Sequence, residues 1–324
     1  MSSLSFNRRT ISKDIIAGLT AAIAGIPDGM ASATLAGVSP VFGLYNLMVG
    51  TPIAALFTSS VYMAVINASA MALVAFDALA PYSGEEQVKA IVTLTLLVGS
   101  FMGLMGLLKL GWLTRFISNS VMRGFLTGIA IVIILGQLSD FTGYDLQGDN
   151  YLAKVFDLLR NLPQVDLATL AVGVLTIVII LILNRTRLKS FSMLIALIVG
   201  AAIVKFMTLE SVALVGEIPE GLPLPMLPDL RLVPELLMSA IAIGIIGLVQ
   251  AAGVSQGYAN PDGKFPNPDG DFRGQGIGNM AASFFQGLPV GGSVSGTALV
   301  VGAGAQSRWA NIFTGIFVAF GVLL

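Results

Sequence analysis

Eleven mostly apolar stretches, each about as long as a membrane-spanning helix, constrain this chain more than any other feature. A helical span takes about 20 such residues. The stretches cover residues 14–36, 40–57, 62–80, 87–109, 116–138, 167–184, 190–208, 233–258, 274–289, 293–306 and 309–324. Only 11% of the residues are charged, whereas a soluble domain carries about a quarter. We therefore predict an all-α polytopic membrane protein.

The basic residues indicate one orientation for these spans. With the N-terminus in the cytoplasm, 12 Lys and Arg residues fall on the cytoplasmic side and 5 on the outside. Cytoplasmic loops of membrane proteins carry such an excess of positive charge. We predict a multi-pass protein of the cell membrane with a cytoplasmic N-terminus.

Three loops and the chain end add detail. Residues 149–162 show helical apolar spacing, which predicts an amphipathic helix on the outer surface. Residues 216–228 are Pro-rich and predict an extended loop, and residues 260–271 predict a polar cytoplasmic turn. The last apolar stretch reaches Leu324 without a polar flank, which we interpret as truncation within a longer membrane domain.

The composition argues against several classes of function. The chain has no Cys and no His, which excludes thiolate zinc sites, Cys nucleophiles and His-based catalysis. Its net charge is −1 and no basic patch suggests nucleic acid. No nucleophile–base pair, metal cluster or cofactor motif stands out, so an enzyme is not the expected function.

A cluster of small residues interrupts one apolar stretch near its middle. It contains Gly287, Pro289, Gly291, Gly292, Ser293, Ser295, Gly296 and Thr297. A broken helix within a membrane persists only where it lines a cavity or is buried in protein. A helix that restarts near Gly292 would present free backbone N–H groups and the positive end of its dipole, which together form an anion site. The alternative is that these residues only allow close helix packing.

The stretch 57–76 provides a matching second break. Its start is polar and β-prone, with Asn67 and Ser69 near its middle. Transporters often place two such half-helices opposite each other at the midplane. The alternative is that Asn67 and Ser69 form ordinary hydrogen bonds between helices.

Two further polar residues lie inside spans. Asp28 follows Pro27 in the first span, which we expect to be interrupted there. An intramembrane carboxyl group indicates a functional site by default, and it suits coupling to a proton. Alternatively, Pro27 ends the helix and Asp28 caps the next segment. Gln250 is the other intrusion, with hydrogen bonding between helices as its alternative role.

Three segments, taken in order, resemble the SulP (sulfate permease) family of anion transporters. They are DIIAGLTAAIAGIPDGMASATLAGVSPVFGLYNLMVGTPIAALF (14–57), VGEIPEGLP (215–223) and RGQGIGNMAASFFQGLPVGGSVSGTALVVGAGAQSRWA (273–310). The resemblance implies a seven-plus-seven inverted-repeat fold. Spans three and ten would be half-helices preceded by short extended segments, with the anion between their N-termini.

The resemblance also implies a division of the chain. Residues 1–210 would form the first repeat (spans one to seven), residues 211–232 an outer loop, and residues 233–324 an incomplete second repeat (spans eight to eleven). The family's usual cytoplasmic STAS domain has no counterpart in this sequence. Family members are commonly dimers, so we expect a homodimer of the full-length form.

Several positions depart from the family pattern. Asp28 stands where the family usually has Gln, and Gln250 stands where many members have Glu. Gly296 replaces a frequent Arg, and residues 63–66 replace a Ser-Val-Gly-Pro motif. The identity of the anion therefore does not carry over from the family.

These observations lead to one hypothesis, secondary active transport of a small inorganic anion, with sulfate or bicarbonate first. H⁺ or Na⁺ would be the coupled ion, with Asp28 and Gln250 as coupling residues. The predicted binding residues are Asp28, Val65, Ile66, Asn67, Ala68, Ser69, Gln250, Gly292, Ser293, Val294, Ser295 and Thr297. Two alternatives remain, a nucleobase transporter of the same architecture and a non-transporting membrane scaffold.

Overall fold

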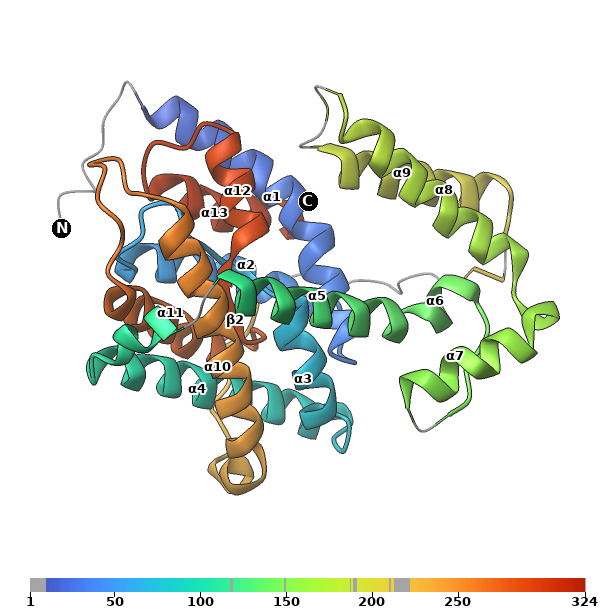
Figure 1. Cartoon of the computed structure of the whole chain (residues 1–324), viewed down its shortest axis with the longest axis horizontal. Helices are drawn as coiled ribbons and strands as arrows, with labels where there is room; N and C mark the ends of the chain where they lie inside the picture. The colour runs from blue at the N-terminus through green and yellow to red at the C-terminus, as the bar shows by residue number, and fades with distance from the viewer. Residues whose placement is uncertain are drawn as a thin grey trace. The chain divides into compact units, whose positions relative to one another are not determined.

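The computed structural model describes residues 10–116, 119–148, 150–186, 188, 191–209, 211–212 and 222–323. The chain forms two compact units (Figure 1). The first combines residues 1–118 with residues 218–324, and the second contains residues 119–217. This grouping by contact differs from the repeat boundaries at 210 and 233, which stay a prediction.

The first unit is a bundle of helices around a short two-stranded ribbon. Its helices are α1 (Ile11–Leu35), α2 (Val41–Phe57), α3 (Ser69–Leu79), α4 (Gly84–Leu107), η2 (Leu110–Phe116), η5 (Leu230–Leu232), α10 (Val233–Gly257), α11 (Pro268–Ser283), α12 (Val294–Gly302) and α13 (Trp309–Leu323). The strands are β1 (Ala64–Asn67) and β2 (Val290–Ser293). Figure 1 shows α12 and α13, from the end of the chain, beside α1 from its start, and both helices contact α1.

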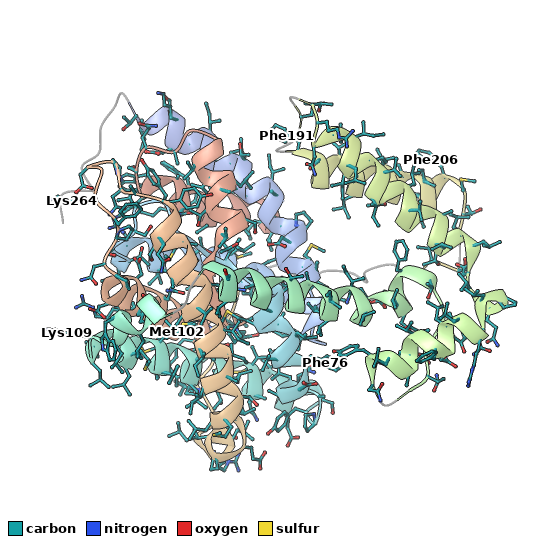
Figure 2. All side chains as sticks on the ribbon, in the orientation of Figure 1. Phe76, Met102, Lys109, Phe191, Phe206 and Lys264 are labelled. Carbon is teal, nitrogen blue, oxygen red and sulfur yellow. The ribbon has the colours of Figure 1, made fainter. Side chains whose placement is uncertain are left out.

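The second unit contains the middle helices. They are α5 (Asn119–Gly136), α6 (Leu138–Thr142), α7 (Tyr151–Arg160), η3 (Leu162–Gln164), α8 (Leu167–Leu183) and α9 (Ser192–Phe206). The amphipathic helix predicted over 149–162 is confirmed as α7, which exposes the apolar side chains of Leu152, Phe156 and Leu159. Phe206 at the end of α9 is also exposed (Figure 2).

Each predicted apolar stretch corresponds to a helix. Two of these helices, α3 and α12, are preceded by a strand. In the described part of the chain, three helices are long and apolar enough to cross a bilayer, at Ile11–Leu35, Gly84–Leu107 and Leu230–Gly257. Shorter apolar helices surround them. Of the extended loop predicted at 216–228, the first six residues lie outside the described residues, and the rest has no regular structure. The polar turn predicted at 260–271 is shorter than expected, because α11 already begins at Pro268.

The interruption predicted at Pro27 was wrong. The helix α1 continues from Ile11 to Leu35 with Pro27 inside it. Asp28 therefore does not cap a new helix. A proline in a membrane helix is tolerated where neighbouring helices support the affected turn, and α1 packs against α2, α12 and α13.

Glycines set the closest helix crossings of this unit. At the crossing of α1 and α2, a Cβ atom on Gly43 would overlap the carbonyl oxygen of Gly29. At the crossing of α4 and α11, a Cβ atom on Gly99 would lie 2.8 Å from the carbonyl oxygen of Gly276. Small residues of this kind let membrane helices approach to backbone contact. The glycines of these two crossings therefore have a structural role.

Both predicted breaks are confirmed as strand–helix junctions. The strands β1 and β2 pair antiparallel, with Ala64 opposite Ser293 and Asn67 opposite Val290. Each strand leads directly into a short helix, β1 into α3 and β2 into α12. Strand pairing satisfies backbone groups that a broken helix would otherwise leave unpaired within the membrane. The ribbon explains why two helices can start in the interior of the bundle.

Side chains from other helices hold the residues in and before each strand. The Thr51 hydroxyl on α2 donates to the carbonyl oxygen of Val65 at 2.7 Å. Thr95 on α4 donates to the carbonyl oxygen of Gly287 at 2.8 Å, just before β2. The amide of Asn311 on α13 donates to a carbonyl oxygen just before β1. Helices from both ends of the unit therefore fix the ribbon.

Candidate functional site

The two short helices begin at opposite ends of the ribbon. Because the strands are antiparallel, α3 starts beside Val290 and α12 starts beside Ala64. Three residue steps of about 3.3 Å separate these positions, or roughly 10 Å along the ribbon. The N-terminus of a helix carries a partial positive charge and unpaired N–H groups. The ribbon therefore places the two electropositive helix starts at its two ends, with one small region between them.

The start of α3 has no side-chain cap. Its N-cap residue is Ala68, which has no polar side chain to accept from the first-turn N–H groups. A small pocket opens at this helix start. Its lining residues are Ser32, Asn67, Ala68, Ala72, Ala75, Leu288 and Pro289. The pocket has an accessible volume of about 10 Å³, room for roughly one water molecule. Its uncapped N–H donors make it a candidate anion site, whose lining would have to open to admit an oxyanion.

The start of α12 is capped within its own turn. The Ser293 hydroxyl accepts from the N–H of Gly296 at 3.0 Å and lies 3.2 Å from the Ser295 hydroxyl. The Thr297 hydroxyl donates to the carbonyl oxygen of Ser293 and accepts from the N–H of Ala64 at 3.1 Å. The side chains of Val294 and Ser295 are exposed. Ser295 is thus the hydroxyl of this turn most accessible to a ligand.

Some predicted binding groups already have partners in the protein. The Asn67 side chain accepts from Asn46 at 2.6 Å and donates to the carbonyl oxygen of Gly43 at 2.8 Å. The N–H of Gly292 donates to the Gln275 side chain at 2.9 Å. These two groups hold the ribbon in place, so the helix starts at Ala68–Ser69 and Val294–Ser295 remain as the anion-binding candidates.

Asp28 lies on α1, one helical turn before Ser32. Residues four apart share a helix face, so Asp28 approaches the side of α1 whose Ser32 lines the pocket. The Asp28 carboxyl group has no hydrogen bond or ion pair within the described residues. Ser32 itself was missed by sequence reasoning, and its spacing from Asp28 is the signal that could have found it.

Gln250 lies on the part of α10 that contacts β2. Its neighbours Gly247 and Ala251 pack against Gly291 and Gly292, so closely that a Cβ atom on either glycine would lie about 3 Å from the α10 backbone. Gln250 is 9% exposed, and its Oε1 atom has no hydrogen-bond partner among the described residues. A buried acceptor without a partner costs free energy. A hydrogen-bond donor on a bound ligand, or a bound cation, would give this atom a partner.

Other buried charges have structural roles that sequence reasoning missed. The Asp271 carboxylate accepts from the N–H of Ser60 at 2.7 Å and from the Ser255 hydroxyl at 2.6 Å. The Arg308 guanidinium donates to the carbonyl oxygens of Ala55, at 2.8 Å, and Ser60, at 3.3 Å. Most of these partners lie far away in sequence, so no local pattern could identify them. Within the described residues, no group of three or more acidic side chains could hold a metal ion.

Comparison with known proteins identifies the relatives of this chain. The profile of the sulfate permease family matches residues 11–324. "Probable sulfate transporter 4.2" of Arabidopsis thaliana is 31% identical over 324 residues, which cover 96% of this chain and 48% of the relative. "Probable sulfate transporter MT1781" of Mycobacterium tuberculosis is 33% identical over 313 residues, which cover 94% of this chain and 55% of the relative.

Solved structures share the fold. The transmembrane domain of a cyanobacterium bicarbonate transporter, BicA, aligns with a TM-score of 0.83 at 24% identity, over 98% of this chain and 84% of that one. The murine Solute Carrier 26 family member A9 anion transporter, in its inward-facing state, aligns with a TM-score of 0.86 at 22% identity, over 100% of this chain and 58% of that one. The predicted inverted-repeat membrane fold is therefore confirmed.

The chain spans about half the length of the curated relatives it matches. The match nevertheless extends over nearly the whole chain, and the strand–helix junctions lie within the matched residues. This chain belongs to the sulfate permease family.

Proposed function

We propose that this chain forms the substrate-binding part of a secondary active transporter of a small inorganic anion. The uncapped start of α3, which opens on the pocket beside Ala68, carries the proposal. Backbone N–H groups suit a small oxyanion, because they supply several donors without a fixed side-chain charge. The N–H groups of Ser69 and Ala70 would contact the anion first, with the Ser32 hydroxyl as a further donor.

The start of α12 would supply the second half of the site. Val294 and Ser295 lie in its first turn, at the other end of the ribbon from Ala68. The Ser295 hydroxyl, with Ser293 and Thr297 behind it, would donate to the anion. Val65, Ile66, Asn67 and Gly292 would then shape the ribbon between the two helix starts rather than bind through their side chains.

Sulfate and bicarbonate are the first candidates for the anion. Relatives are named as sulfate transporters, and one structural relative is described as a bicarbonate transporter. No Lys or Arg occurs among the predicted binding residues, so two helix dipoles would provide the positive potential. This favours a small anion over a large polyanion, because the field of a helix terminus falls off within about one turn.

Asp28 and Gln250 would couple transport to H⁺ or Na⁺. An ionised carboxyl group near a bound anion raises the energy of the complex, and a proton or Na⁺ would lower it. The buried, unpartnered Oε1 atom of Gln250 is an acceptor for the same cation. We place the transporter in the cell membrane with its N-terminus in the cytoplasm, where the basic loops would lie.

Thermal stabilisation of the purified chain in detergent tests this function. Sulfate, bicarbonate, chloride, a dicarboxylate and uracil are titrated separately at constant ionic strength. We expect a saturable rise in Tm with sulfate or bicarbonate, because a ligand that binds the folded state stabilises it. Stabilisation by uracil alone would favour the nucleobase alternative. No response to any of them would contradict the proposal.

A further inference from the structure

One face of α11 carries three polar residues at four-residue spacing. Asp271, Gln275 and Asn279 are all fully buried. Side chains four apart on a helix lie above one another, so the three form a continuous stripe, hereafter the α11 polar face. Buried polar groups in a membrane helix are costly unless they are paired. Their partners therefore indicate what the face does.

Asn279 pairs with both backbone groups of Val290. Its Oδ1 atom accepts from the N–H of Val290 at 2.7 Å, and its Nδ2 atom donates to the carbonyl oxygen of Val290 at 2.8 Å. The same nitrogen lies 3.5 Å from the sulfur of Met102 on α4. A neighbouring strand would make the same two backbone bonds to Val290.

Gln275 continues this pattern one turn earlier. Its Oε1 atom accepts from the N–H of Gly292 at 2.9 Å, and its Nε2 atom donates to the carbonyl oxygen of Asp271 at 3.2 Å. Polar groups of alternate residues in a strand point to the same edge. Val290 and Gly292 are alternate residues, so the α11 polar face binds the edge of β2 that β1 leaves open.

Asp271 extends the face to the segment before the other strand. Its carboxylate accepts from the N–H of Ser60 at 2.7 Å and from the Ser59 hydroxyl at 3.0 Å. These residues lie just before β1. One helix therefore contacts both the strand that leads into α12 and the segment that leads into β1 and α3. Any shift of α11 would move both leading segments together.

We propose that Gln275 and Asn279 are positioning residues for the anion site, because they fix the register of β2 and thereby the place where α12 begins. The inference rests on the proposed function, since it concerns the same site. Neither residue touches the pocket at Ala68. Gln275 and Asn279 would instead set the spacing of the two helix starts. That spacing would determine anion affinity and selectivity between anions.

The test compares two variants with a matched control in the purified full chain. Gln275→Met keeps the side-chain volume and removes the acceptor for Gly292. Asn279→Asp keeps the acceptor for Val290 and, when protonated, also offers one donor. Ser283→Ala is the control, because Ser283 is buried one turn further along α11 and donates only to the carbonyl oxygen of Met280 on its own helix.

Anion affinity is measured from the Tm shift against sulfate, bicarbonate and chloride concentration, with the Tm in the absence of anion recorded separately. We expect Gln275→Met to weaken binding at least tenfold and to change the order of preference among the anions. Asn279→Asp should bind more tightly as the pH is lowered. Ser283→Ala should keep the wild-type Kd and preference.

The outcomes separate the inference from the proposed function. If the wild-type chain binds an anion and both variants fold and bind it with unchanged Kd and preference, the positioning role is wrong while the proposed function stands. If Gln275→Met lowers only the Tm without anion and leaves Kd unchanged, the residue acts in stability alone and the inference is also overturned. If the wild-type chain binds none of the anions, the proposed function fails and the inference fails with it.

Discussion

The carboxylate of Asp14 accepts a hydrogen bond from the backbone N–H of Gln306 at 2.6 Å, although the two residues are 292 positions apart. It also accepts from the N–H of Ser307 at 3.0 Å and from the Ser307 hydroxyl at 2.6 Å. The start of α1 thus holds the turn that leads into Arg308 and α13. This contact joins the two ends of the first unit.

Removal of this carboxylate should destabilise the fold. Asp14→Ala removes the acceptor of two part-buried N–H groups and of the Ser307 hydroxyl, and each lost hydrogen bond costs about 0.5–1.5 kcal/mol. We expect a clear fall in Tm in detergent. Asp77→Ala, which removes an exposed carboxylate of the same unit, should leave Tm nearly unchanged. Equal Tm values for the two variants would show that the Asp14 contact adds little stability.

The α1–α2 crossing should not accept a methyl group. Gly43→Ala would place its Cβ atom against the carbonyl oxygen of Gly29, so the helices must separate, at a cost of about 1–3 kcal/mol. Gly257→Ala is the control, because a Cβ atom there meets nothing within 4 Å. The two variants are compared by size-exclusion chromatography after heating, and Gly43→Ala should lose more of its folded peak. If Gly43→Ala keeps the wild-type profile, the crossing is not tight.

Asp28→Asn should remove coupling and keep anion binding. The amide has nearly the same shape as the carboxyl group but neither gains a proton nor attracts Na⁺ strongly. We expect the anion-dependent Tm shift to persist while uptake into proteoliposomes loses its dependence on pH or Na⁺. Asp77→Asn controls for a general change in charge. Wild-type pH and Na⁺ dependence in Asp28→Asn would exclude Asp28 as the coupling residue.

The N-cap of α8 should be sensitive to acid. The Thr169 hydroxyl donates to Asp166 at 2.5 Å and, with further hydrogen bonds, lowers the pKa of this carboxyl group to about 2 from 3.8. A depressed pKa stabilises the fold at pH values above the unfolded pKa, and this contribution is lost as the pH falls through about 2.

Asp166→Ala measures this contribution as a difference from wild type. The difference in Tm between wild type and Asp166→Ala should be largest at pH 5 and should decrease as the pH falls toward 2. Asp166→Asn keeps an acceptor for the Thr169 N–H, so its difference in Tm from wild type should be smaller than that of Asp166→Ala at pH 5. It should narrow over the same pH range, because neither variant titrates at this position. A gap for Asp166→Ala that grows on acidification would contradict the assigned pKa.

The sequence predicted those parts of the fold that depend on local composition. Apolar length is a local property, and most helix bounds follow the predicted stretches within a few residues, whereas α11 begins and ends six residues before its stretch and α3 begins seven residues into its own. The break before α12 was also visible, because Pro289 and the nearby glycines disfavour a helix wherever they occur. The effect of Pro27 depends on the helices around it, so a local pattern suggested a break that packing against α2 and α13 removes.

The candidate site was only partly visible in the sequence. The half-helix starts at Ala68 and Val294 could be located, because each follows a short polar or glycine-rich segment. The sequence did not reveal that Asn67 and Gly292 are held by Asn46 and Gln275, since those partners come from other helices. Buried hydrogen bonds of this kind are properties of the assembled bundle and leave no periodic signal.

The ribbon has a consequence for how the protein is made. Val290, the partner of Asn67, is synthesised more than 220 residues later, which at 5–20 residues per second corresponds to roughly 10–45 seconds. During that interval β1 has no strand to pair with, although unpaired backbone groups are costly within a bilayer. We infer that the third span stays incompletely paired during this interval. It can take its final place only after the polypeptide has returned to supply the second strand.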